Sequence, residues 1–351
     1  MGNKISSRQF WLLATTMTIT FKLNNFASLI YRGYNVTTAV VFAAYLVLDF
    51  VVATFVYRLA RRDFFSLLTV KRRLALSVLL TTFYVIKLTL NLSIEVAFCK
   101  NNLVTEMPTW LVYLIATLTA VVLSKFKLNS LARTNEIVLP IVAFTMLVGL
   151  VFLRVEINFD YLLPVFSKYN QGFGGAFKYF AWSLDSLPLL TCKVEDREDN
   201  KARSGKVFYF LGVIFAVGLV IVGQAIYGGA LKDVDNLYVK IGVFNDYNLQ
   251  LGRLDWISIT CWELSAIVSV GVGANAVRSS VNLFFKSKKA PYFAFVFVYV
   301  LLITVMKEQE KTVNLMLNYL GYVGFYTSAA ALILMFFAKI RGNYGKKNTE
   351  K

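Results

Sequence analysis

Ionisable and hydroxyl-bearing side chains occur inside long apolar segments of this sequence. Such groups are costly in lipid unless they face a cavity or a partner, so they mark candidate functional sites. An ammonium group can hold a carboxylate, a carboxylate can hold an amine or a proton, and a hydroxyl can donate or accept a hydrogen bond. A binding site for a small polar solute is therefore predicted from Thr18, Thr20, Lys22, Asp185, Glu263 and Ser269. Gly174, from the same apolar segment as Asp185, is included in this predicted site.

Lys22 is the most unusual member of this set, because it lies near the middle of the first apolar segment. Its ammonium group is predicted either to bind a substrate carboxylate, to act as a fixed cation or to form a buried structural ion pair. Asp185 is the expected partner of Lys22 or of a substrate amine. Asp49 and Lys87 are expected to form a structural salt bridge, and Glu95 is expected to reach solvent near the end of the third segment.

Catalysis, metal binding and cofactor binding are not expected. No nucleophile–base arrangement, metal-ligand cluster or phosphate-binding loop is recognisable in the sequence. The chain contains no histidine, which removes the usual zinc ligand and the usual general base. Cys99, Cys192 and Cys261 lie far apart, and they are expected to be unpaired residues that hold no metal.

These residues must be positioned by membrane-spanning helices. Of the 351 residues, 57% are hydrophobic and only 16% are charged, which excludes an ordinary soluble domain. Ten apolar stretches are long enough to cross a bilayer, and they are centred near residues 20, 47, 86, 117, 145, 175, 217, 268, 298 and 326. The sequence therefore predicts an all-α integral membrane protein with ten transmembrane helices, in a single domain that spans residues 1–351.

Basic residues alternate between dense and sparse connections along the chain. With the N-terminus inside, 25 of the 37 lysines and arginines fall on inside connections and 8 on outside connections. Both termini are therefore predicted to be cytoplasmic, because basic connections resist translocation. Anionic membrane lipid accounts for the net charge of +17, and no nucleic-acid partner is expected. Trp11, Trp110, Trp182 and Trp256 lie close to span ends, which predicts an interfacial aromatic belt.

Ten spans can be divided into two halves of five, covering about residues 8–155 and 156–340, with a short cytoplasmic tail at residues 341–351. Because five is odd, the second half would run antiparallel to the first, as in transporters with an inverted repeat. Such transporters bind substrate near the bilayer midplane, where the first helix of each half is broken.

Both predicted halves open with a segment that is poorly suited to a continuous helix. The first span carries a run of hydroxyl, ammonium and amide groups from Thr15 to Asn25, and the sixth carries Gly174, Asp185 and Pro188. Helices 1 and 6 are therefore predicted to be broken at the solute site. In the alternative reading, the threonines bond back to their own helix and the glycines allow close packing.

Several short motifs together resemble a known family. They are Ile5–Phe10 (ISSRQF), Leu131–Ile137 (LARTNEI), Tyr161–Phe166 (YLLPVF), and Gly252–Asp255 (GRLD) with Trp262. In this order they resemble the B subunits of spore germinant receptors over nearly the whole chain. The resemblance implies the amino acid–polyamine–organocation transporter superfamily, a LeuT-type 5+5 inverted repeat, and a location in the inner membrane of a spore-forming bacterium.

The resemblance also implies a function. The chain would be a permease-like nutrient receptor subunit that binds a small solute, with an amino acid implied by the permease likeness, and signals germination together with A and C subunits. The alternative is a proton- or ion-coupled amino acid secondary transporter, and a third reading is a scaffold that binds nothing. The chain departs from the family at Thr20-Phe21-Lys22, where the family has a small, glycine-containing stretch. A lysine there could replace a sodium ion, pair with a substrate carboxylate or block the site.

Overall fold

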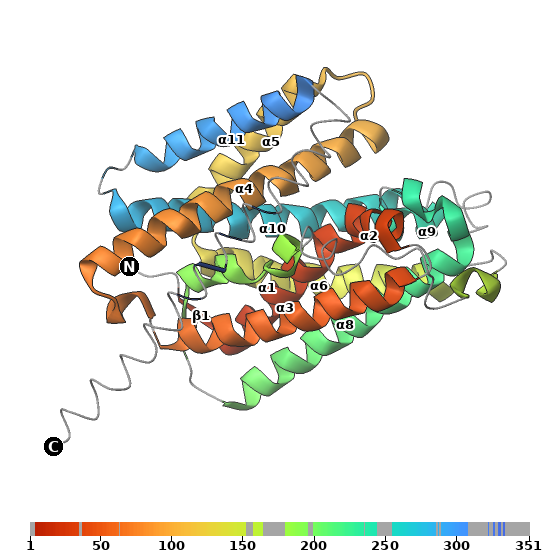
Figure 1. The fold of residues 1–351 in the computed structure, drawn as a ribbon, viewed down its shortest axis with the longest axis horizontal. Coiled ribbons are helices and arrows are strands. Elements are labelled where there is room, and N and C mark those ends of the chain that lie inside the picture. Colours follow the sequence, from red (N-terminus) through yellow and green to blue (C-terminus); the bar gives the residue numbers. More distant parts are fainter. Residues whose placement is uncertain are drawn as a thin grey trace.

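In the computed structural model, most of the chain is helical and the long helices run roughly side by side (Figure 1). The structure describes residues 4–34, 37–62, 64–151, 157–163, 180–195, 199–234, 236–243, 255–285 and 289–307, together with a few isolated positions. The predicted site residue Gly174 lies outside the described residues, as does most of the tenth predicted span.

Five of the described helices are long and apolar enough to cross a membrane. They are α3 (Thr38–Arg61), α4 (Val70–Asn102), α6 (Leu128–Val151), α8 (Asp199–Tyr227, continued by the 3-10 helix η7, Gly228–Asp233) and α10 (Asp255–Phe284). Two shorter apolar helices are α5 (Thr109–Lys125) and α11 (Ala290–Lys307). These helices support a multi-pass membrane protein, while the total of ten spans and the inverted repeat stay predictions.

The first predicted span is interrupted. It consists of α1 (Ser7–Phe21), a π-helical turn η1 (Lys22–Phe26) and α2 (Ala27–Tyr34). A capping box starts α1, since the Ser6 hydroxyl accepts from the Gln9 backbone N–H at 3.2 Å and the Gln9 side chain accepts from the Ser6 N–H at 3.1 Å. Within η1, Asn24 has a non-helical ψ of −105°. The break therefore falls in Lys22–Phe26, at the end of the polar run that predicted it.

The described part of the sixth predicted span is not an α-helix. It consists of two 3-10 helices, η5 (Phe180–Ser183) and η6 (Leu187–Thr191), joined by a buried turn that contains Asp185. Pro188 lies at the start of η6, where its missing N–H removes no helical hydrogen bond. This irregular backbone is compatible with a membrane protein because it is enclosed by other helices.

Two helices organise the packing. The α10 helix contacts α4, α5 and α6, and α1 contacts α8, α6 and α10, so both are largely buried (Figure 1). On the outside of the bundle, large apolar side chains remain uncovered, such as Phe144 on α6 at 67% exposed and Phe293 on α11 at 73% exposed. Such a surface is costly in water and suits contact with lipid tails.

A small parallel sheet ties the N-terminus to a distant connection. Strand β1 (Lys4–Ser6) pairs with β2 (Lys193–Glu195), and the ammonium group of Lys4 lies 2.5 Å from the Glu195 carboxylate. The N-terminal segment and the connection after the sixth predicted span therefore lie at the same end of the bundle. The charge pattern places both on the same side of the membrane, and their cytoplasmic location stays a prediction.

Candidate functional site

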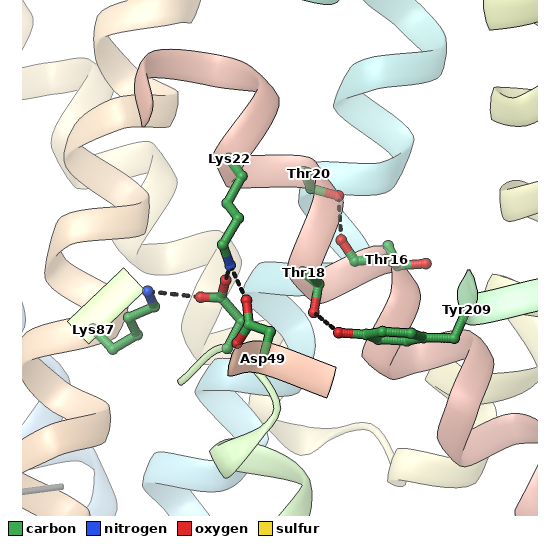
Figure 2. Close-up of polar contacts among 8 residues, drawn as sticks. Thr16, Thr18, Thr20, Lys22, Asp49, Lys87 and Tyr209 are labelled. Carbon is green, nitrogen blue, oxygen red and sulfur yellow. Dashed lines mark hydrogen bonds and ion pairs between the residues drawn. The ribbon is translucent and has the colours of Figure 1, made fainter. Parts of the chain in front are cut away.

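Four buried charges from four elements meet beside the break in the first helix. The Lys22 ammonium at the start of η1 donates to the Oδ2 atoms of Asp49 on α3 and Asp185 on the η5–η6 turn. The Lys87 ammonium on α4 lies 2.7 Å from Oδ1 of Asp185. All four residues are at least 95% buried. We call Lys22, Asp49, Lys87 and Asp185 the charge quartet. Figure 2 shows the Lys22 and Lys87 ammonium groups reaching the carboxylates from different sides.

The quartet has two positive and two negative groups and so carries no net charge when all four are ionised. Charges at membrane depth are costly, and removing one partner of a buried pair destabilises a protein by about 3–5 kcal/mol. The break in the first helix places Lys22 where it can reach both aspartates. π-helical turns of this kind are frequent at functional sites.

Several polar atoms next to the quartet are buried without a hydrogen-bond partner in the part of the chain that the structure describes. They are Oδ1 of Asp49, the side-chain amide of Asn24 in η1, and the hydroxyls of Ser183 and Ser186, which flank Asp185. Buried polar groups are normally satisfied, and each exception calls for an explanation. A polar solute could supply the missing partners.

Threonines on α1 connect the quartet region to neighbouring helices. The Thr20 hydroxyl lies 2.5 Å from the Ser265 hydroxyl on α10 and donates to the Thr16 carbonyl at 2.7 Å. The Thr18 hydroxyl lies 3.3 Å from the Tyr209 hydroxyl on α8 and points toward it in Figure 2. Two of the predicted site residues thus join α1 to α10 and α8.

Aromatic rings border the quartet on one side. The Lys87 ammonium lies 4.8 Å from the centre of a Trp182 ring, and Trp182 stacks on Phe26 with centroids 5.3 Å apart. The prediction of an interfacial belt is wrong for Trp182 and for Trp11, which are only 2% and 0% exposed. Trp182 was not among the predicted site residues, although it lies three residues before Asp185.

The other predicted site residues lie elsewhere. Glu263 on α10 accepts a hydrogen bond from the Cys99 thiol on α4 at 3.3 Å. Ser269 is buried, and its hydroxyl has no partner among the described residues. The prediction that Glu95 reaches solvent is wrong, since it is only 8% exposed. The structure therefore joins Lys22 and Asp185, and it adds Asp49 and Lys87 to them in one network.

Comparison with known proteins identifies the family. The model of a family described as spore germination protein matches residues 69–313, which is more than half of the chain. The matched region contains Lys87 and Asp185 and begins after Lys22 and Asp49. A comparison with curated proteins gives no match. On the strength of the family match and the apolar helices, the chain belongs to the membrane-embedded spore germination protein family of germination permeases and germinant receptor B subunits.

Proposed function

We propose that the protein is the permease-like subunit of a nutrient germinant receptor and that it binds a small solute at the charge quartet. An amino acid is the solute class that the chemistry fits best. The observation that carries this proposal is the balanced pairing of two ammonium groups with two carboxylates beside a broken helix. Family membership supports a role in germination.

A zwitterionic amino acid has the same charge pattern as the quartet. Its carboxylate could take the place of an aspartate at Lys22 or Lys87, and its ammonium group could take the place of a lysine at Asp49 or Asp185. Such an exchange adds no net charge to a buried site, so it avoids the cost of an uncompensated ion. The unpartnered atoms of Asn24, Ser183 and Ser186 could complete the hydrogen bonds of the solute.

Signalling would follow from the same exchange. The quartet joins η1, α3, α4 and the η5–η6 turn, so separating its members changes the contacts between these elements. A ligand can shift a conformational equilibrium only through a difference in its affinity for two states. We propose that the solute-bound state presents a different surface to A and C subunits, which pass the signal on.

A proton- or ion-coupled amino acid transporter is the second candidate. It is favoured by Asp49, whose second carboxylate oxygen has no partner among the described residues and could accept a proton when Lys22 moves away. The receptor and the transporter are distinguished by measuring uptake of radiolabelled amino acids into proteoliposomes, with and without a proton gradient. Gradient-dependent uptake supports the transporter, and saturable binding without uptake supports the receptor.

Germination assays of two variants test the quartet as a solute site. Lys22→Met leaves two carboxylates with one lysine, so we expect reduced amounts of protein in the spore membrane. Lys22→Met combined with Asp49→Asn restores neutrality and leaves the Lys87–Asp185 pair, so we expect near-normal amounts. If the quartet binds the solute, spores with this double variant as their only B-type subunit fail to germinate on a mixture of L-amino acids.

Lys127→Met is the matched control, because Lys127 is an exposed lysine outside the quartet. It should leave both protein amount and germination unchanged. Immunoblots of inner-membrane fractions and the fall in optical density during germination are the two measurements. A double variant that is present in normal amount and responds normally would assign the quartet a purely structural role.

A further inference from the structure

A second cluster of ionisable groups lies outside the charge quartet, between α4 and α10. Glu95 and Cys99 are four residues apart on α4 and therefore share one face of that helix. Glu263 reaches them from α10, and one ligand atom from each of the three side chains lies within 4.8 Å of the others. The Cys99 sulfur lies 3.3 Å from Oε1 of Glu263.

The two carboxylates are not neutralised by a basic residue. Glu95 is only 8% exposed, and neither of its carboxylate oxygens accepts a hydrogen bond from the described residues. Within the described ranges, no ion pair includes Glu95 or Glu263. Two like charges this close and this poorly solvated are unfavourable unless a cation or protons accompany them.

We propose that Glu95, Cys99 and Glu263 form a binding site for a divalent transition-metal ion, with Zn²⁺ as the best match. Carboxylate oxygens and a cysteine thiolate are both zinc ligands, and thiolate disfavours Mg²⁺ and Ca²⁺. The two carboxylates and the thiolate carry three negative charges, so a bound divalent ion leaves one, and a proton kept on one carboxyl group makes the site neutral without any help from a lysine. Three protein ligands leave a fourth position for water, as in zinc sites that keep an open position.

The geometry needs only small adjustments to hold the ion. Zinc–ligand distances of about 2.0–2.3 Å in a tetrahedron place ligand atoms roughly 3.5 Å apart. The Cys99–Glu263 contact already has this spacing, and rotation of the carboxylate side chains could bring the remaining atoms closer. Asn91 lies one helical turn before Glu95, and its buried amide oxygen has no partner within the described ranges, so it is a candidate to orient the site.

The metal would connect two packed helices that are distant in sequence. α4 and α10 pack against each other, and Cys99 and Glu263 are 164 residues apart. An ion held by both helices would stabilise their contact. This site does not share a residue with the charge quartet, so the inference does not depend on solute binding.

Metal binding by the purified, full-length protein tests the proposal. After treatment with a chelator, the protein in detergent should take up one equivalent of Zn²⁺, as measured by elemental analysis. Cys99→Ser and Glu95→Gln should each weaken binding at least about 100-fold in competition with a chromophoric chelator, since loss of an outer-shell partner alone costs 10–100-fold. Co²⁺ should give a thiolate-to-metal absorption band that is lost in Cys99→Ser.

Cys261→Ser is the matched control, because Cys261 is a buried cysteine on α10 that is not part of the cluster. This variant should bind Zn²⁺ as the unchanged protein does. Size-exclusion chromatography shows whether each variant is folded, and Glu263→Gln provides a second carboxylate test if Glu95→Gln aggregates. Failure of the unchanged protein to retain Zn²⁺, or equal affinity in the unchanged protein and folded Cys99→Ser and Glu95→Gln variants, would overturn the proposal.

Discussion

Lys22 is held by two carboxylates from different elements, and Lys87 extends the network through Asp185. A solute-binding role and a structural ion-pair role for Lys22 are both compatible with this arrangement, because a buried ion pair can also be opened by a zwitterionic ligand. These two roles are distinguished by the germination response of a variant that keeps the charge balance, such as Lys22→Met combined with Asp49→Asn. At the scale of single residues, the charge quartet is therefore best studied through paired substitutions.

Hydroxyl contacts around the quartet are also open to test. Thr20→Val removes the hydroxyl that contacts Ser265 at 2.5 Å and leaves the buried Ser265 hydroxyl without this partner. We expect this change to lower the melting temperature of the detergent-solubilised protein, at a cost of about 1–3 kcal/mol. Adding Ser265→Ala should recover part of the loss, because the orphaned hydroxyl is then gone.

Thr119→Val on α5 is the control for this pair. The Thr119 hydroxyl donates to the Ile115 carbonyl of its own helix at 2.9 Å and is exposed, so its loss should have little effect. Thermal-shift measurements compare the unchanged protein with Thr20→Val, with Thr20→Val combined with Ser265→Ala, and with Thr119→Val. Equal shifts for Thr20→Val and Thr119→Val would show that the contact between α1 and α10 contributes nothing.

At the scale of elements, the position of α1 depends on close packing against α8. Gly205 on α8 faces α1 so tightly that an added Cβ would lie 2.9 Å from Cβ of Trp11 and 3.2 Å from Cα of Arg8. The backbone of α1 cannot rotate away as a flexible side chain could. Small residues at such contacts are typical of helix pairs in membranes.

Gly205→Ala should therefore push α1 away from α8. We expect a destabilisation of about 1–3 kcal/mol, as in other overpacked sites, and weaker germination because α1 leads into the quartet. Gly218→Ala on the same helix is the control, since nothing lies within 4 Å of its added Cβ. That change should be neutral or slightly stabilising, because alanine favours helices more than glycine. Protein amount in the membrane and melting temperature measure both effects, and equal results would contradict the packing argument.

At the scale of the whole molecule, charge distribution sets the orientation. Lys127 lies between α5 and α6, in a connection that is predicted to be on the cytoplasmic side of the membrane. Glu106 lies before α5, in a connection that is predicted to be on the opposite side. In a background with Cys99, Cys192 and Cys261 replaced by serine, Lys127→Cys should react with a membrane-impermeant maleimide only in inverted vesicles. Glu106→Cys should react only in right-side-out vesicles. The reverse pattern would overturn the predicted topology, and labelling of both in one vesicle type would contradict α5 as a span.

Part of this architecture follows from the sequence alone. The polar run from Thr15 to Asn25 predicted a break in the first helix, and the structure has a π-helical turn that overlaps the end of this run. Trp11, Trp182 and Glu95 were predicted to be exposed near span ends, and this prediction is wrong because all three are buried. Distance from a span end in sequence does not determine burial, because helix rotation and neighbouring helices decide which side chains face inward.

The sequence by itself determined that this is a helical membrane protein of the spore germination family and marked Lys22 and Asp185 as costly charges. Hydropathy and charge act on each segment separately, so they can be read without knowing its neighbours. Only the tertiary structure decided which charges meet. Lys22 is 27 residues from Asp49 and 163 from Asp185, and Cys99 is 164 from Glu263. Such contacts depend on the relative placement of whole helices, which no local pattern specifies.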